Sequence, residues 1–322
     1  MVTVEPRRRV SGTLRPWLVA VVVAAVMAGC GGSGDTTTAR PSKPSVRVVS
    51  VEKVDVRTRD LLIDSPAVGQ DVTVRLLLPA GFEAQPDRRW PVLYLLHGAN
   101  DPDTYLSWTR STDVAALTAK LDVLVAMPEG GTDGHYSNWW NDGRGGPPAW
   151  ETFHLVELLQ VLERDWRASD RRAVAGLSMG GLGAMLYAAR SPKRFQAAAS
   201  FSGLLDTFRW SDFPMDLWGD RVEQRDVWRR HNPVEVAADL RGVALLVSYG
   251  DGRQGPLDAE LNSVGGRIEH TLAAGNRAFV QRLRALGIPA QVRAYGPGTH
   301  SWPYWQRELR LAMPAIMKAL AT

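Results

Sequence analysis

The chain has 322 residues, of which 45% are hydrophobic and 22% are charged, a balance that suits one large α/β domain or two smaller ones. Its formal net charge is +4, but residues 1–29 hold four arginines and one glutamate, and the rest of the chain carries 34 basic and 33 acidic residues. This even balance excludes the basic stripe of a nucleic-acid-binding protein, so we expect no nucleic-acid partner.

The first 30 residues have the pattern of an export signal. An apolar run of eleven residues, 17–27, follows a basic start and is too short to span a bilayer comfortably. Met27-Ala28-Gly29-Cys30 then leads into the only cysteine and resembles the bacterial lipobox, whose cysteine is acylated and becomes the new N-terminus. We predict a lipoprotein signal peptide over residues 1–29, lipid attachment at Cys30 and a location on the outer face of the cytoplasmic membrane. A soluble secreted protein, an uncleaved anchor and twin-arginine export through Arg7-Arg8-Arg9 remain alternatives.

A polar segment separates this signal from the rest of the chain. Residues 30–45 are rich in Gly, Ser, Thr and Pro and lack apolar periodicity, so we predict a flexible tether. The folded domain is then expected over residues 46–322. Because Cys30 is the only cysteine, disulfides contribute nothing to the stability of the mature chain.

Short apolar runs alternate with helical patterns along this domain. We predict strands over residues 72–78, 92–96, 123–126, 173–175, 197–201, 243–247 and 291–294. Helices are predicted over residues 113–120, 150–167, 179–190, 271–286 and 302–320. Several strands are apolar throughout, which is typical of parallel strands covered on both faces. The pattern predicts an α/β fold with a mostly parallel sheet and helices on both faces, and residues 204–232 as an excursion over one end of the sheet.

The segment Gly176-Leu177-Ser178-Met179-Gly180 is a G-x-S-x-G motif between a predicted strand and a predicted helix. In this context the motif sets the serine on a sharp turn, and the glycines let neighbouring backbone come close. We predict that Ser178 is a nucleophile whose Oγ points over the C-terminal edge of the sheet. An ordinary glycine-rich turn is the alternative.

A serine hydroxyl needs a base to act as a nucleophile at neutral pH, and the chain has six histidines. His300 lies between the last predicted strand and the last predicted helix. Because the triad in such folds runs Ser, acid, His along the chain, we expect His300 to be the base. Surface or packing roles are expected for His135, His154, His231 and His270.

Two carboxylates compete to be the acid of the triad. Asp251 directly follows the strand at 243–247, and Glu269 lies at the start of the following helix. Spacing alone slightly favours Asp251, and a solvated loop carboxylate is the alternative for either residue. The two backbone N–H donors of an oxyanion hole are expected at Met179, after the nucleophile, and at Ala99, in the loop after the strand at 92–96.

Five stretches carry a family resemblance from about residue 61 to residue 320: VLYLLHG, WETF, GLSMGG, SFSGLL and above all GTHSWPYW. In these the chain resembles the antigen 85, or mycolyltransferase, branch of the esterase-type α/β-hydrolases. The resemblance implies an α/β-hydrolase fold and a Ser-Glu-His triad. Matching RIEHTLAAGNRAF to the family pattern, with the glutamate ten residues before Phe279, makes Glu269 the acid beside Ser178 and His300.

The resemblance does not extend to the sugar-binding stretch of the family. There the family carries an Asp before the oxyanion-loop glycine and an Arg two residues after it, whereas this chain has His97 and Asn100. A His-Gly pair is typical of general esterases of this fold, where the histidine holds the oxyanion loop without transferring protons. We assign substrate contacts to His97, Asn100 and Trp302.

The resemblance implies acyl transfer. We expect an exported serine esterase or acyltransferase that forms an acyl-enzyme on Ser178 and passes the acyl group to water or to a sugar hydroxyl. Ester or glycolipid substrates and a membrane reached through the lipid anchor are the expected partners, with no metal and no cofactor. A plain carboxylesterase for short acyl or aromatic esters and a non-catalytic cell-wall-binding protein are the alternatives. The aromatic residues between 208 and 218 either line an acyl or glycan groove or simply pack over the sheet edge.

Overall fold

The computed structural model describes residues 45–321. The predicted signal peptide, Cys30 and all but the last residue of the predicted tether therefore lie outside the described residues. Among residues 45–321, no helix is both long enough and apolar enough to cross a membrane.

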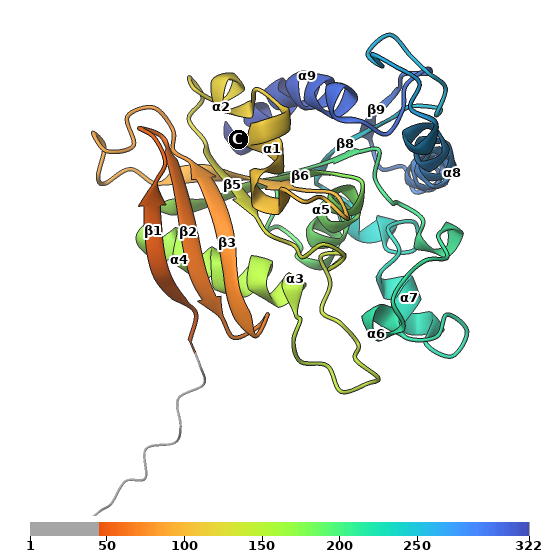
Figure 1. Cartoon of the computed structure of the whole chain (residues 1–322), viewed down its shortest axis with the longest axis horizontal. Helices are drawn as coiled ribbons and strands as arrows, with labels where there is room; N and C mark the ends of the chain where they lie inside the picture. Colours follow the sequence, from red (N-terminus) through yellow and green to blue (C-terminus); the bar gives the residue numbers. More distant parts are fainter. Residues whose placement is uncertain (1–44, 322) are drawn as a thin grey trace, which may run out of the picture. The chain divides into compact units, whose positions relative to one another are not determined.

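One mixed sheet runs through this part of the chain in the strand order β1-β2-β3-β5-β4-β6-β7-β8-β9 (Figure 1). The strands are β1 (Arg47–Lys53), β2 (Thr58–Ser65), β3 (Gln70–Leu77), β4 (Trp90–Leu96), β5 (Leu124–Pro128), β6 (Ala168–Leu177), β7 (Ala197–Phe201), β8 (Ala244–Tyr249) and β9 (Ala290–Ala294). Neighbours from β5 to β9 pair in parallel, and β1, β2, β3 and β5 pair antiparallel. The predicted α/β fold with a mostly parallel sheet is confirmed.

The helices are α1 (Ser107–Ser111), α2 (Val114–Leu117), α3 (Trp150–Thr152), α4 (Leu158–Asp165), α5 (Met179–Arg190), α6 (Met215–Trp218), α7 (Arg225–Arg230), α8 (Ser263–Ala285) and α9 (Trp302–Ala321). Short 3-10 turns lie at Thr104–Leu106, Thr207–Arg209 and Ala237–Leu240, and a π-turn at Phe153–Glu157 joins α3 to α4. The predicted helix at 179–190 matches α5. The helix predicted at 113–120 is only the single turn of α2, and α8 begins eight residues earlier than expected, so that Glu269 lies inside the helix.

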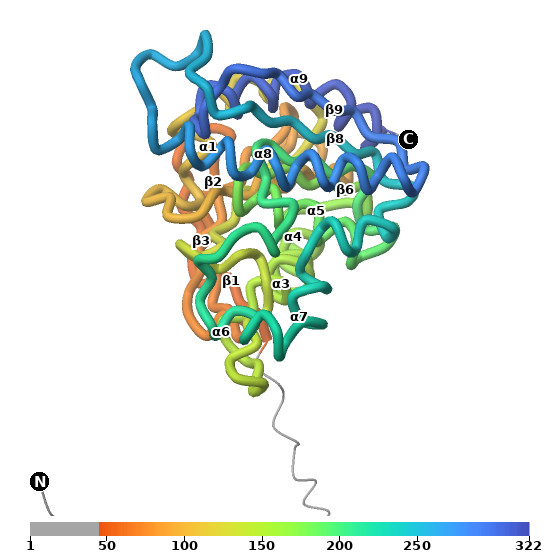
Figure 2. Tube along the Cα trace, turned by 90° about the vertical axis from the view of Figure 1, so that its right-hand side faces the viewer, coloured from red at the N-terminus to blue at the C-terminus, as the bar shows by residue number. Residues whose placement is uncertain are grey.

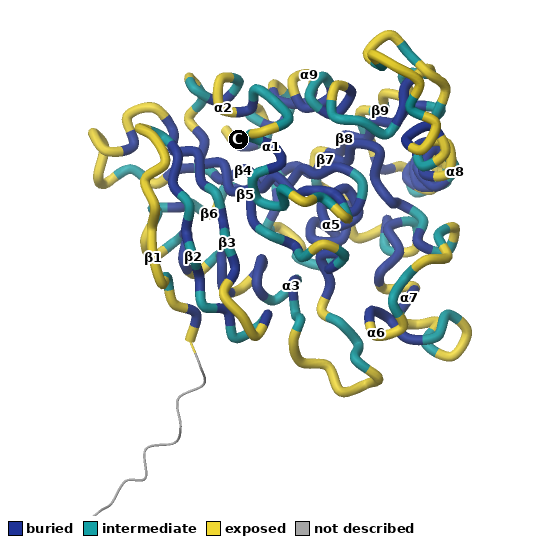
Figure 3. Tube along the Cα trace, in the orientation of Figure 1, coloured by how far each residue is buried: buried dark blue, intermediate teal, exposed yellow. Residues whose placement is uncertain are grey.

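Two apolar cores lie on the two faces of the sheet. Because successive side chains of a strand point to opposite faces, β4 sends Val92, Tyr94 and Leu96 into the core beneath α4, α5 and α8. It sends Leu93 and Leu95 into the core beneath α1, α2 and α9. Figure 3 shows the central strands buried and β1 largely exposed at one edge. This double covering makes β4, β5 and β7 almost entirely apolar, which is why they could be predicted from the sequence.

The antiparallel strands β1 and β2 were not predicted. β2 alternates buried with half-buried residues and includes Arg59 and Asp60, and β1 is exposed along nearly its whole length. Such strands contain no long continuous apolar run, so the pattern that predicts the parallel strands does not predict them. They extend the sheet at the edge opposite to β9 (Figure 1).

The excursion after β7 forms a small third core of its own. Its 3-10 turn, α6 and α7 pack Trp218 and Trp228 against Leu182 and Leu186 of α5. Figure 2 shows the trace of α6 and α7 in a second view. Because the parallel strands end at the same edge of the sheet, the loops after β4, β5, β6, β8 and β9 gather there. These loops carry the candidate site.

Candidate active site

Ser178 stands on a strained turn between β6 and α5. Its backbone angles are φ 52° and ψ −119°, a left-handed conformation that costs a non-glycine residue about 1–3 kcal/mol. A Cβ atom on Gly176 would lie 2.3 Å from the carbonyl oxygen of Gly180, and one on Gly180 would lie 2.3 Å from that of Leu96. The glycines of the motif are therefore required by the close approach of backbone around the serine.

Ser178 opens into a cavity of about 250 Å³. The cavity is lined by Ala99, Asn100, Asp133, His135, Ser178, Met179, Leu204, Trp210, Asp212 and Leu272. Within residues 45–321 the Ser178 hydroxyl has no hydrogen-bond partner, so the structure shows no Ser178–His300 hydrogen bond, and His300 does not line the cavity.

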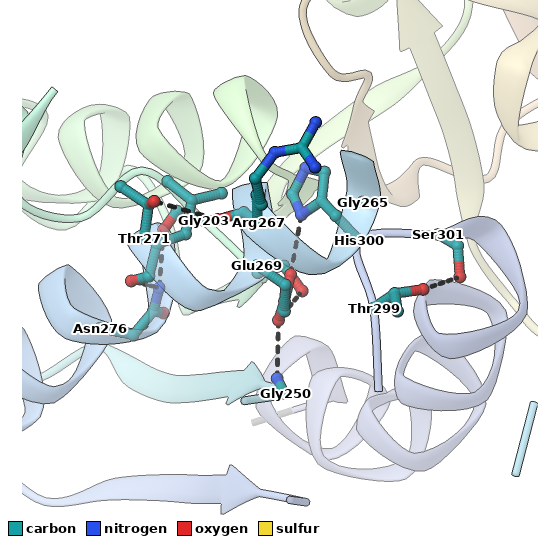
Figure 4. A network of polar contacts seen from close by, with 12 residues as sticks. Gly203, Gly250, Gly265, Arg267, Glu269, Thr271, Asn276, Thr299, His300 and Ser301 are labelled. Atoms are coloured by element: carbon teal, nitrogen blue, oxygen red, sulfur yellow. Dashed lines mark hydrogen bonds and ion pairs between the residues drawn. The ribbon is translucent and has the colours of Figure 1, made fainter. Parts of the chain in front are cut away.

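His300 and Glu269 form a bonded pair. His300 Nδ1 lies 2.8 Å from Glu269 Oε2, and Figure 4 shows the two side chains facing each other. Glu269 is fully buried, and its Oε1 accepts hydrogen bonds from Ser202 Oγ at 2.8 Å and from the Gly250 N–H at 2.6 Å. The carboxylate therefore has a donor on each oxygen, which compensates for its burial.

Asp251 lies outside this network. Its carboxylate binds the Arg253 guanidinium at 2.6 Å and 2.9 Å, and this side-chain hydrogen bond lowers the pKa of Asp251 against a smaller opposing effect of burial. The structure brings Glu269, and not Asp251, to the His300 ring. Spacing favoured Asp251 because the strand end is the expected position, whereas α8 carries Glu269 to the ring on its second turn.

Two free backbone donors line the cavity beside Ser178. The N–H groups of Ala99 and Met179 have no acceptor within the described residues, and both residues line the cavity. Met179 is the first residue of α5, where N–H groups lack intrahelical partners. The arrangement fits a site that binds developing negative charge.

His97 holds the loop that carries Ala99. It is 1% exposed, Gly130 donates its N–H to Nε2 at 2.9 Å, and Nδ1 lies 2.8 Å from the Gly98 carbonyl oxygen. Nε2 is therefore the acceptor and Nδ1 carries the proton. Burial lowers the pKa of His97, which keeps the ring neutral. Neither nitrogen is free to bind a substrate, so the expectation of a substrate contact at His97 is not supported by its position.

Substrate contacts were also expected at Asn100 and Trp302, of which only Asn100 lines the cavity. Asn100 is exposed, lines the cavity and has φ 53°, with its N–H bonded to the Thr132 carbonyl oxygen at 2.7 Å. Trp302 does not line the cavity. Its ring packs edge-to-face on Trp108 and Trp305, and Trp305 in turn contacts the His300 ring at a centroid distance of 4.8 Å. Trp302 thus supports the His300 side of the site.

The structure adds three cavity residues that sequence reasoning missed: Asp133, His135 and Asp212. His135 Nε2 lies 2.6 Å from Asp133 Oδ1, and the His135 ring packs against Phe213 and Trp218. The position of Asp133 and His135 after a parallel strand was the available signal, because ligands bind at these strand ends. Among residues 45–321 no group of three potential ligands is placed to hold a metal ion.

The aromatic residues between 208 and 218 take both of the expected roles: one lines the cavity and others pack over the sheet edge. Trp210 lines the cavity. Phe213 and Trp218 instead pack on each other and on Trp228, with ring centroids 4.8 to 5.3 Å apart. The packed rings support the wall of the cavity that Trp210 completes.

The family described as "Putative esterase" matches residues 65–316. The chain belongs to this esterase family. It is 33% identical over 274 residues to the esterase Rv1288 of Mycobacterium tuberculosis H37Rv, covering 79% of this chain and 58% of that protein. It is 29% identical over 336 residues to the diacylglycerol acyltransferase/mycolyltransferase Ag85B of Mycolicibacterium smegmatis, covering 95% of this chain and 96% of that protein.

Among solved structures, Mycobacterium tuberculosis MPT51 (FbpC1) superimposes with a TM-score of 0.67 at 25% identity, covering 81% of this chain and 97% of that one. The neighbours have the α/β-hydrolase fold, which confirms the predicted fold, and the resemblance to the antigen 85 branch is confirmed by the similarity to Ag85B. The chain therefore shares the family and the fold of these proteins, and it spans 58% of the length of Rv1288.

Proposed function

We propose that Ser178, His300 and Glu269 form a catalytic triad that exchanges esters through an acyl-enzyme. The observation that carries the proposal is the cavity that unites a free serine hydroxyl with the free N–H groups of Ala99 and Met179. The buried Glu269, bonded to His300 at 2.8 Å, supports the same assignment because it orients the ring and stabilises its charged form.

In the first half-reaction, His300 accepts the hydroxyl proton of Ser178 while Oγ attacks the ester carbonyl. The N–H groups of Ala99 and Met179 bind the oxyanion, and such a donor is typically worth about 10²–10³ in rate. Collapse of the tetrahedral intermediate breaks the bond to the alcohol, which leaves with the proton from His300. Ser178 then carries the acyl group.

In the second half-reaction, a hydroxyl compound gives its proton to His300 and attacks the acyl-enzyme. The bond from the acyl carbon to Ser178 Oγ then breaks, and His300 returns the proton to Oγ. Water as acceptor makes the protein an esterase, and a sugar hydroxyl makes it an acyltransferase. The similarity to Ag85B supports the transferase, whereas the similarity to Rv1288 supports the esterase. The cavity of about 250 Å³ is smaller than the roughly 300–1,000 Å³ of typical ligand pockets, which favours short acyl groups and hence the plain carboxylesterase as second candidate.

The test of the triad is hydrolysis of p-nitrophenyl butyrate by Ser178→Ala. We expect kcat to fall by about 10⁴-fold or more, because substitution of the nucleophile alone removes most of the rate enhancement. Retained turnover in this variant would exclude Ser178 as the nucleophile, whereas a wild-type protein without turnover would favour the non-catalytic binding protein. Incubation with acyl esters and sugar acceptors, followed by mass spectrometry, then decides between water and sugar.

We further propose the chain as an exported lipoprotein whose Cys30 is acylated after removal of residues 1–29, followed by a tether to residue 45 and a hydrolase domain over residues 46–322. The pattern Met27-Ala28-Gly29-Cys30 supports this assignment. Expression of the full chain should yield a membrane-associated protein with a diacylated or triacylated Cys30 by mass spectrometry. A Cys30→Ser variant that stays on the membrane in equal amount would contradict it.

A further inference from the structure

Two neighbouring residues in the loop after β5 have strained backbones. His135 has φ 49° and Tyr136 has φ 52°, a left-handed conformation that residues other than glycine seldom adopt. Such residues persist where the surrounding structure holds them, and they cluster at functional sites. Between them, the two residues contact both of the elements that carry Ala99 and Met179.

Tyr136 is bonded to the loop of residues 97–99, which carries Ala99. Its side chain is fully buried, and its hydroxyl donates to the His97 carbonyl oxygen at 3.0 Å. The His97 ring accepts the Gly130 N–H at 2.9 Å, and a Cβ atom on Gly130 would lie 2.7 Å from Tyr136 Cε1. Tyr136 therefore packs on the residue that holds the His97 ring, and it holds the same loop at a second point, two residues before Ala99.

The same pair of residues contacts the helix that begins at Met179. The His135 N–H donates to Met179 Sδ at 3.3 Å. One turn further along α5, a Cβ atom on Gly183 would lie 2.6 Å from Tyr136 Cγ. Real Cβ atoms do not come this close to other atoms, so the Tyr136 ring packs directly on the backbone of α5.

We propose that Tyr136 is a positioning residue that sets the distance between the N–H groups of Ala99 and Met179. The inference rests on the proposed function, in which these two groups bind the oxyanion. The Tyr136 hydroxyl fixes the loop of one donor, and the Tyr136 ring fixes the helix of the other. Two donors stabilise an oxyanion only when both point at the position that the oxygen takes in the transition state, so a small shift of either one lowers the rate.

The proposal predicts a loss that is confined to the transition state. A weakened interaction of this kind lowers kcat and kcat/KM by the same factor and leaves KM unchanged. A trifluoromethyl ketone adds to the serine hydroxyl as a tetrahedral hemiketal whose oxygen occupies the position of the oxyanion. Its affinity should therefore fall by the same factor as kcat/KM.

The experiment measures hydrolysis of p-nitrophenyl butyrate and inhibition by propyl trifluoromethyl ketone. In Tyr136→Phe, which removes only the hydroxyl, we expect kcat to fall about tenfold, KM to stay within about twofold and the inhibition constant of the ketone to rise about tenfold. Met179→Leu removes the sulfur that accepts the His135 N–H but keeps the Met179 backbone N–H. It should lower kcat and the ketone affinity about threefold, because a bond to sulfur is weaker.

Tyr187→Phe is the matched control. Tyr187 is equally buried, and its hydroxyl lies 2.8 Å from His154 Nδ1, so this variant loses a buried hydroxyl that does not bind the loop of residues 97–99. Urea unfolding should give Tyr187→Phe and Tyr136→Phe similar losses of stability. The kcat and the ketone affinity of Tyr187→Phe should nevertheless stay within about twofold of the wild-type values.

Equal losses of kcat in Tyr136→Phe and Tyr187→Phe would overturn the positioning role, as would a lower kcat in Tyr136→Phe with unchanged ketone affinity. If Tyr136→Phe does not fold, Met179→Leu decides: weaker ketone binding supports the role, and unchanged binding overturns it. Turnover retained in Ser178→Ala would instead overturn the proposed function, whatever the Tyr136 variant does.

Discussion

Two histidine–carboxylate pairs lie at this site, and they differ in what surrounds them. His300 and Glu269 meet at 2.8 Å, and His135 and Asp133 meet at 2.6 Å. Glu269 is fully buried and accepts two further hydrogen bonds, from Ser202 and Gly250. The Asp133 side chain is 38% exposed and accepts no other side-chain or backbone hydrogen bond in the described structure.

The difference shows that distance within a pair does not decide its role. The Glu269 carboxylate is held in one orientation by groups that a substrate cannot displace, as the acid of a catalytic triad requires. The Asp133 carboxylate keeps an open side toward the cavity, as a ligand-binding group requires. The two pairs should therefore respond with different strength to the same kind of substitution.

The largest difference in kcat between the two pairs is expected when the charge of Glu269 or of Asp133 is removed. Glu269→Gln should lower kcat for p-nitrophenyl butyrate by about 10³-fold or more, because the amide no longer stabilises the charged His300 ring. Asp133→Asn should lower it by less than about tenfold, because Asp133 meets His135 and not the His300 ring. Steady-state kinetics on both variants measure the contrast. Equal losses would show that the two pairs do not have separate roles.

His154 is a buried histidine that does not line the cavity, and its protonation should affect stability rather than catalysis. Burial is the largest effect on His154 and lowers its pKa to about 3, and its Nδ1 and Nε2 lie 2.8 Å and 2.7 Å from Tyr187 Oη and the Glu129 carbonyl oxygen. Since the folded protein resists protonation that the unfolded chain accepts near pH 6.5, stability is complete above that pH and is lost as the pH falls toward 3. Between pH 7 and pH 5 this one group should lower the free energy of unfolding by about 2 kcal/mol.

Urea unfolding at pH 7 and pH 5 measures this effect. His154→Gln should lose about 2 kcal/mol less than the wild type over the same interval, although it starts from a lower stability. His270→Gln is the control, because His270 is exposed. The same pH sensitivity in wild type and His154→Gln would contradict the assignment to this buried ring.

Substitution of Ser202 should lower kcat by a smaller factor, because Ser202 acts through Glu269. It is 1% exposed and donates to Glu269 Oε1 at 2.8 Å, so we treat it as a positioning residue. Ser202→Ala should lower kcat about tenfold with little change in KM, since one charge-assisted hydrogen bond is worth about 1.5 kcal/mol or more. Ser200→Ala is the matched control, because Ser200 is equally buried and its hydroxyl has no partner in the described residues. Equal effects of the two variants would remove the positioning role.

The smallest effect is expected at His135. His135→Phe keeps an aromatic ring against Phe213 and Trp218, so kcat/KM for p-nitrophenyl butyrate should fall about threefold or less. His300→Phe should instead remove almost all turnover of the same ester. A loss of 10³-fold in His135→Phe would place this histidine in the proton relay.

The parallel core and the Ser178 turn could be predicted from the sequence because both depend on local pattern. β4 and the second half of β6 are apolar on both faces, and Ser178 lies between a strand and a helix that each have clear signals. The lipobox and tether stay predictions, as do the catalytic roles. The exposed strand β1 and the half-buried strand β2 could not be predicted, because charged residues interrupt their apolar pattern.

The choice between Asp251 and Glu269 depended on a family resemblance, because spacing could not show that α8 begins at Ser263. The signal for that start was Asn262, whose side chain accepts the Gly265 N–H at 2.8 Å as a helix cap. The two cavity carboxylates, Asp133 and Asp212, were missed for a different reason. Asp133 and Asp212 come from loops 79 residues apart in the sequence, and only the fold brings them to one cavity.

Covalent labelling tests the central claim most directly. The wild-type protein, treated with a fluorophosphonate and digested, should carry one phosphonyl adduct on Ser178, and Glu269→Gln should acquire it far more slowly. The Ser178→Ala variant should acquire no phosphonyl adduct. An adduct on a different serine in the wild type, or rapid labelling that does not depend on Glu269, would contradict an activated nucleophile at this turn.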